Sequence, residues 1–232
     1  IFRSRDGQAA YRNRYVDTLA IQGERADGRS ISPGVMGPFD YSLSPFGIKD
    51  TSNTDIFIYN GDLMSLWYNA GHPYRLDAQT LETKGYYDLQ GRAQRRMSAH
   101  SKVDLATGEL LFFDYGDQPP YMTYGVAGPS GKLLHEVAID LPGPRLPHDI
   151  GFTRHYTILH DLPFFHDMDV LRQHGYRVLT FHRDIPTRFG LIPRYGAGNE
   201  VRWFECEPCY ILHTSNAWEV TRENCRFVTA RA

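Results

Sequence analysis

The chain alternates short apolar runs with turns along most of its length. In residues 54–69, two runs rich in β-branched and aromatic residues flank Asn60-Gly61, and Asn-Gly is the strongest two-residue signal for a β-hairpin. The same strand–turn–strand pattern recurs in residues 76–89, 101–116, 121–141, 148–164 and 199–220. We therefore expect an all-β fold built from consecutive hairpins.

Helical patterns are weak by comparison. The best candidate for a helix is "FHDMDVLRQHG", residues 165–175, and it is short. Hairpins repeated in this way are typical of the stacked four-stranded sheets of a β-propeller, or else of a β-sandwich. The chain has no tryptophan–aspartate or kelch-like repeat, so the repetition is one of structure and not of sequence.

The composition excludes several classes of protein. The net charge of −2, without a strongly basic block, argues against binding to nucleic acid. No apolar run approaches the length of a transmembrane span, and the N-terminus lacks the pattern of a signal peptide. Three cysteines argue against a disulfide framework, so we expect a cytoplasmic protein. The chain begins without Met, which suggests a segment of a longer protein.

Three of the ten histidines stand where a loop meets an expected strand. They are His100, His148 and His213. Their spacing is far too wide for a zinc finger, but it suits ligands that successive sheets contribute around one axis. Neutral imidazole binds iron, zinc, copper and nickel alike, so the spacing leaves the metal open. The alternative is that these are ordinary strand-end histidines without a ligand role.

A second candidate metal site is "CEPCYILH", in which Cys206, Cys209 and His213 have a C-x2-C-x3-H spacing. Structural zinc needs four ligands, and Cys225 is the only further thiol in the chain. A redox C-x-x-C pair lacks the expected strand-to-helix setting here, so buried and inert cysteines are the favoured interpretation. No nucleophile motif or phosphate-binding loop is present, and no catalytic residue beyond the candidate metal ligands is predicted.

The stretches around the three histidines resemble the motifs of the carotenoid cleavage oxygenases, especially the lignostilbene dioxygenase-like branch. They are "SAHSKVDLATGELLFFDY", "PHDIGFTRHYTILHDLPF" and "WFECEPCYILHTSNAWE", and they follow one another in the family's order. "YRNRYV" at residues 11–16 and "PYRLDAQTLETKG" at residues 73–85 also match. The resemblance therefore covers almost the whole chain.

This resemblance implies a seven-bladed β-propeller with Fe(II) on its axis, held by four histidines. His100, His148 and His213 match the first three of these ligands. The fourth is expected beyond residue 232, because family members are about twice as long as this chain. Residues 1–232 would then form one domain, an incomplete propeller.

The resemblance also implies contacts with the substrate. Tyr11 matches a tyrosine that contacts a phenolic substrate in stilbene-cleaving relatives, and Trp67 stands where these relatives carry a lysine. Phe46 precedes the first matching hairpin and is a further candidate. Many relatives have a glutamate near Tyr68 or Asn69 that orients a ligand histidine; that carboxylate is absent here, although an acid elsewhere could take its role.

The activity that the resemblance implies is that of a non-haem Fe(II) dioxygenase. Such an enzyme uses O2 to split a carbon–carbon double bond of a stilbenoid, carotenoid or apocarotenoid into aldehyde or ketone products. The alternatives are a metal-free β-propeller that binds without chemistry, and an isomerohydrolase of the retinoid type. The expected partner is a hydrophobic alkene. Phe164 and Phe165 could contact a membrane surface peripherally, but a packed pair is the favoured interpretation.

Overall fold

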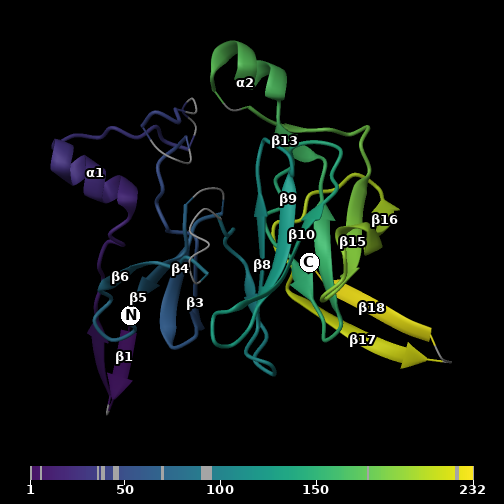
Figure 1. The fold of residues 1–232 in the computed structure, drawn as a ribbon, viewed down its shortest axis with the longest axis horizontal. Coiled ribbons are helices and arrows are strands. Elements are labelled where there is room, and N and C mark those ends of the chain that lie inside the picture. Colours follow the sequence, from purple (N-terminus) through teal and green to yellow (C-terminus); the bar gives the residue numbers. More distant parts are fainter. Residues whose placement is uncertain are drawn as a thin grey trace.

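A computed structural model describes residues 2–5, 7–35, 37, 40–43, 47–68, 71–89, 96–176, 178–222 and 225–231. In these residues three four-stranded antiparallel sheets follow one another along the chain, from left to right in Figure 1. A two-stranded hairpin, residues 216–231, follows the third sheet in the chain and lies beyond it. The predicted all-β fold is confirmed, and the described sheets form part of a propeller.

Each of the three sheets is a run of antiparallel strands. The first sheet contains β3 (Asp55–Tyr59), β4 (Asp62–Leu66), β5 (Tyr74–Leu76) and β6 (Thr83–Tyr86). The second contains β7 (Lys102–Val103), β8 (Leu110–Tyr115), β9 (Met122–Ala127) and β10 (Leu133–Ile139). The third contains β11 (Gly151–Phe152), β12 (Tyr156–Asp161), β15 (Thr187–Pro193) and β16 (Arg202–Cys206).

The remaining strands form two-stranded hairpins, and the helices are short. The hairpins are β1 (Phe2–Arg5) with β2 (Gln8–Tyr11), β13 (Phe164–His166) with β14 (Leu179–Phe181), and β17 (Asn216–Arg222) with β18 (Cys225–Arg231). The helices are α1 (Leu19–Asp27), α2 (Met168–His174) and the 3-10 helix η1 (Gly198–Glu200). In the part of the chain that the structure describes, no helix has the length and apolar character of a membrane span.

Five of the six predicted hairpin regions form adjacent antiparallel strands, and the sixth does not. Within residues 199–220, β16 pairs with β15 and closes the third sheet, whereas β17 pairs with β18 and starts a new one. The prediction of a hairpin there is therefore wrong. The connection between the two strands, residues 207–215, is longer than the two to five residues typical of a hairpin loop. It carries the chain from the last strand of one sheet to the first strand of the next.

The helices also differ in part from the prediction. Residues 165 and 166 belong to β13, and α2 starts only after Asp167, whose carboxylate accepts hydrogen bonds from the backbone N–H groups of Asp169 and Val170. Helix α1 was not predicted at all. It buries none of its residues and contains Gly23, so it lacks the apolar stripe that marks a helix in a sequence.

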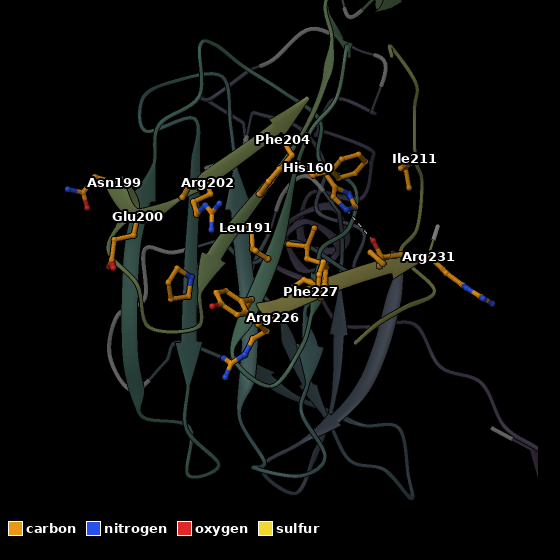
Figure 2. A pocket seen from close by; sticks show the side chains of 18 residues that line it. His160, Leu191, Asn199, Glu200, Arg202, Phe204, Ile211, Arg226, Phe227 and Arg231 are labelled. Atoms are coloured by element: carbon orange, nitrogen blue, oxygen red, sulfur yellow. Dashed lines mark hydrogen bonds between the residues drawn. The ribbon is translucent and has the colours of Figure 1, made fainter. Parts of the chain in front are cut away.

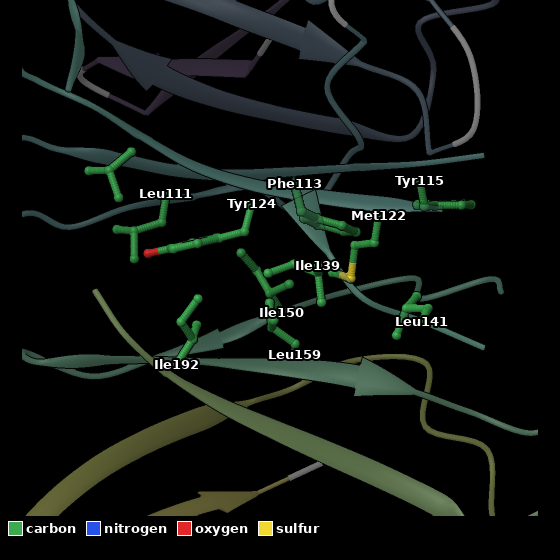
Figure 3. Packing of buried hydrophobic residues seen from close by; sticks show 11 residues of the cluster. Leu111, Phe113, Tyr115, Met122, Tyr124, Ile139, Leu141, Ile150, Leu159 and Ile192 are labelled. Atoms are coloured by element: carbon green, nitrogen blue, oxygen red, sulfur yellow. The ribbon is translucent and has the colours of Figure 1, made fainter. Parts of the chain in front are cut away.

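Strand β8 explains how the sheets stack. It is buried on both faces: Leu110 and Phe112 pack toward the first sheet, while Leu111 and Phe113 pack toward the third. Figure 3 shows the second of these clusters, which fills the space between the second and third sheets. Gly125 lies opposite Phe112 in β9, and a Cβ atom there would collide with the phenyl ring. Two-sided burial therefore fixes both faces of the middle sheet.

The first strands of the sheets are tied together by one buried carboxylate. Asp149 lies just before β11 and is fully buried. Its Oδ1 lies 2.7 Å from Nζ of Lys102 in β7 and accepts a hydrogen bond from the Ile150 N–H. Its Oδ2 accepts a hydrogen bond of 2.9 Å from the backbone N–H of Thr214, just before β17. Asp149 thus joins the starts of three consecutive sheets.

A second buried carboxylate anchors α1 to the first sheet. Asp50 is 2% exposed, and its Oδ2 accepts a hydrogen bond of 2.7 Å from the hydroxyl of Tyr74. The same hydroxyl accepts one from the backbone N–H of Leu19, and the hydroxyl of Thr18 donates to the Asp50 carbonyl. Burial raises the pKa of Asp50 to about 6. The ionised form of Asp50 is therefore unfavourable in the folded chain.

We expect Asp50→Asn to stabilise the chain at neutral pH. The pKa of Asp50 in the folded chain lies above the ordinary value of 3.8. The stability that its protonated carboxyl contributes is therefore complete below pH 3.8 and is lost as the pH rises through about 6. At pH 7 the substitution should raise the free energy of unfolding by roughly 2 to 3 kcal/mol. Urea unfolding at pH 7 and pH 4 measures this. The gain should shrink at pH 4, and the exposed Asp140→Asn is the control. An equal gain at both pH values would contradict the explanation.

We expect Asp149→Ala to destabilise the chain by about 3 kcal/mol, because the substitution leaves Lys102 without its partner and the Thr214 N–H without an acceptor. Asp149→Asn keeps an acceptor but loses the ion pair, and it should cost less. Urea unfolding at pH 7 measures both variants. A cost below 1 kcal/mol for the alanine variant would show that Asp149 does not hold the three sheets together.

Candidate metal centre

The structure brings the three predicted histidines to one place. The ring centroids of His100 and His148 are 4.7 Å apart, those of His100 and His213 are 4.5 Å apart, and those of His148 and His213 are 5.1 Å apart. One ring nitrogen from each lies within 4.8 Å of the other two. Three side chains from three different sheets could therefore share one metal ion. Their role as ligands stays a prediction.

Their position follows from where they stand in each sheet. Each histidine comes two or three residues before the first strand of its sheet, namely β7, β11 or β17. β11 and β17 are in contact, and the ion pair of Lys102 in β7 with Asp149 joins β7 to the residues before β11. Side chains at equivalent positions therefore meet near the axis around which the sheets are arranged.

Burial favours the neutral form of these imidazoles. Burial, together with the neighbouring His100 and His213, lowers the pKa of His148 to about 4. Burial also lowers the pKa of His100. Neutral imidazole has a free lone pair, which is the form that binds a metal. His100 and His148 are therefore ready to act as ligands at neutral pH.

One ring nitrogen of the three histidines is buried without a hydrogen-bond partner among the described residues. Nε2 of His100 is buried and has no hydrogen-bond partner in the part of the chain that the structure describes. An unpaired buried polar atom is costly unless a missing group satisfies it. A metal ion would satisfy it, so the donor set fits a transition metal. Three imidazoles with nitrogen donors suit iron, zinc, copper or nickel.

Carboxylates and one aromatic ring surround the three histidines. Oδ2 of Asp55 lies 3.8 Å from Nδ1 of His100, and Oδ2 of Asp149 lies 3.6 Å from Nδ1 of His213. The ring of Tyr68 lies 5.5 Å from the ring of His148. Sequence reasoning did not select Asp55 or Asp149. Asp149 directly follows His148 in the second motif, but nothing in the sequence indicated that it points toward His213.

An aromatic cavity of about 220 Å³ adjoins His148. Its lining is mainly apolar and includes Tyr68, Tyr115, Leu146, His148, Phe164 and Tyr210. Phe164 and Tyr210 meet edge to face, with ring centroids 4.7 Å apart. A cavity of this kind suits a flat, conjugated molecule that stacks on aromatic rings.

The predicted substrate contacts lie in different surroundings. Trp67 is 6% exposed and packs edge-on against Tyr68, so Tyr68 is the residue of this pair that lines the cavity. Tyr11 ends β2 and is 64% exposed. Phe46 lies outside the described residues. Phe165 is half-buried, stacks on His182 and lies under Arg145, as expected of a packed residue.

The cysteines form no comparable group. Among the described side chains, the three histidines are the group of three or more ligating residues that could share an ion, and Cys206 and Cys209 are not part of it. Cys206 is exposed and Cys209 is half-buried, so the expectation of buried cysteines is wrong for Cys206. Cysteine at a strand end and in the following loop need not pack inward. The side chain of Cys225 lies outside the described part of the chain.

A larger cavity of about 1070 Å³ lies elsewhere (Figure 2). It separates the third sheet from the β17–β18 hairpin, and none of the three histidines lines it. His160 does, and its Nε2 lies 3.1 Å from the hydroxyl of Thr214. This cavity is distinct from the aromatic one beside the candidate metal centre.

Curated relatives of this chain are oxygenases, and the chain spans less than half of their length. The carotenoid 9,10(9',10')-cleavage dioxygenase of Crocus sativus is 32% identical over 237 residues, covering 94% of this chain and 43% of that protein. Resveratrol cleavage oxygenase 1 of Aspergillus fumigatus is 33% identical, covering 94% and 44%. Isoeugenol monooxygenase of Pseudomonas nitroreducens is 30% identical, covering 94% and 46%.

Solved structures agree with these relatives. The lignostilbene dioxygenase of Pseudomonas brassicacearum superposes with a TM-score of 0.81 at 33% identity, covering 93% of this chain and 46% of its own. A Synechocystis apocarotenoid oxygenase gives a TM-score of 0.77 at 27% identity, covering 94% and 49%. The family model described as RPE65, retinal pigment epithelial membrane protein, matches residues 1–232. The chain therefore belongs to the RPE65 family, that of the carotenoid cleavage oxygenases.

Proposed function

We propose that this chain carries three of the metal ligands of a non-haem iron dioxygenase. Its reaction would split a carbon–carbon double bond of a stilbenoid, carotenoid or apocarotenoid with O2 and give aldehyde or ketone products. The observation that carries the proposal is the convergence of His100, His148 and His213 beside an aromatic cavity. The family of the chain and the names of its relatives support the same reaction.

The three imidazoles would hold Fe(II) as neutral ligands. The lowered pKa of His148 and the unpaired Nε2 of His100 support this role. Three neutral ligands would leave the dipositive charge of the ion intact. When bound, such an ion supplies the binding and activation of O2. The chain itself would position the substrate, exclude water from the site and supply the charges around the ion.

The aromatic cavity would hold the alkene next to the ligands. Tyr68, Phe164 and Tyr210 present ring faces and edges that can pack on an aryl or polyene system. Tyr115 and Leu146 also line the cavity. No acid or base is assigned, because no protein group has to move a proton for the double bond to be split. Tyr11, Phe46 and Trp67 stay proposed substrate contacts; Trp67 packs edge-on against Tyr68, which lines the cavity.

The metal is tested by mass spectrometry after anaerobic loading with Fe(II), on this chain and on any longer natural form that contains it. We expect about one iron per chain, and at least a tenfold loss of affinity in His100→Ala and His148→Ala. His174→Ala, an exposed helix histidine, is the matched control and should bind as the wild type does. Absence of bound iron in every form would contradict the proposal and favour a metal-free binding module.

The reaction is tested by product analysis with a hydroxystilbene and with an apocarotenoid under ¹⁸O2. We expect labelled carbonyl products from at least one of them. Tyr68→Ala should raise KM about tenfold, because it removes a ring that lines the cavity. An isomerised alcohol without label would instead identify an isomerohydrolase.

A further inference from the structure

His100 has a backbone conformation that few residues of its kind adopt. Its φ of 65° places it in the left-handed region, unlike His148 and His213. For a residue with a Cβ atom this conformation costs roughly 1 kcal/mol, and it persists only where neighbouring groups enforce it. The structure must therefore contain contacts that hold the chain in this conformation at His100.

Two of these contacts come from the two residues that follow β4. The backbone N–H of Ala99 donates to the carbonyl of Trp67 at 3.1 Å, and the hydroxyl of Ser98 donates to the carbonyl of Tyr68 at 2.9 Å. They fix the residues before His100. They do not hold the N–H of His100 itself.

The third contact comes from Asp55, the first residue of β3 in the neighbouring sheet. Its Oδ2 accepts a hydrogen bond of 2.9 Å from the backbone N–H of His100. β3 and β7 are in contact, so the carboxylate reaches across from one sheet to the next. Asp55 thus holds His100 by its main chain at the point where the backbone is strained.

The same oxygen also faces the imidazole. It lies 3.8 Å from Nδ1 of His100, and both side chains are largely covered, at 24% and 15% exposure. Among the described residues, Asp55 has no ion pair with a lysine or arginine, whereas Asp149 is paired with Lys102. An unneutralised carboxylate on this side favours a proton on Nδ1. Nε2, which is buried and unpaired, is then left with its lone pair.

We propose that Asp55 is a positioning residue of the metal centre: it locks His100 in its left-handed turn and faces Nδ1, so that Nε2 is presented to the metal. This inference rests on the proposed function. It assigns to Asp55 the kind of role, orienting a ligand histidine, that a glutamate near Tyr68 has in many relatives. In this chain the corresponding region places Tyr68 against His148 instead.

The first test uses Co(II) affinity, measured by competition with a chelator. Asp55→Ala removes both the acceptor and the charge, and we expect at least tenfold weaker binding. Asp55→Asn keeps an acceptor for the His100 N–H and loses the charge, so a loss of about threefold is expected. Asp140→Asn is the exposed control and should leave the affinity unchanged. Wild-type affinity in both Asp55 variants would overturn the proposal.

A second measurement separates positioning from a merely structural role. ¹⁵N NMR of the metal-free chain, with His100 assigned by comparison with His100→Gln, should show the proton on Nδ1. In Asp55→Asn, the population should shift toward the Nε2-protonated form. A proton on Nε2 in the wild type would overturn the proposal even if Asp55→Ala fails to fold.

The outcome for His100→Ala distinguishes this inference from the proposed function. If His100→Ala loses metal while the Asp55 variants keep it, Asp55 has no positioning role and the iron site stands. If His100→Ala binds Co(II) as tightly as the wild type, His100 is not a ligand, and both the site and the role of Asp55 fail.

Discussion

The contacts of one buried carboxylate, that of Asp149, hold the candidate site together. Asp149 lies two residues before β11, and its side chain contacts Lys102 at the start of β7 and the backbone of Thr214, two residues before β17. His148 precedes it in the chain, and His213 precedes Thr214. A carboxylate buried in this way is costly to leave unpaired, so its partners cannot separate freely. The distances between the histidines follow from this constraint.

Packing between the sheets supplies the rest of the rigidity. Strand β8 buries alternate side chains in two different clusters, so that the middle sheet cannot shift against either neighbour without opening a cavity. His100 and His148 stand just before β7 and β11, whose Val103 and Phe152 pack against these clusters. A site built on such positions is held more closely than one built on mobile loops.

Different groups around the histidines affect their protonation and shape the neighbouring cavity. Burial keeps His100 and His148 neutral, and two carboxylates face the outer nitrogens of His100 and His213. Aromatic side chains make the cavity on the side of His148. Charge therefore lies behind the candidate ligands and apolar surface lies on the side where an alkene would bind, an arrangement that suits a neutral, hydrophobic substrate.

The sequence by itself determined what depends on neighbours in the chain. Turn residues and alternating apolar runs predicted most of the hairpins, and three long motifs singled out His100, His148 and His213. It failed in two places: the strands of residues 199–220 pair with β15 and β18, their neighbours on the other side along the chain, rather than with each other, and α1 has no apolar stripe to reveal it. Only the tertiary structure decided that Asp55 holds His100 and that Tyr68 lines the cavity, because both contacts join residues that different strands bring together, and local patterns carry no record of such pairs.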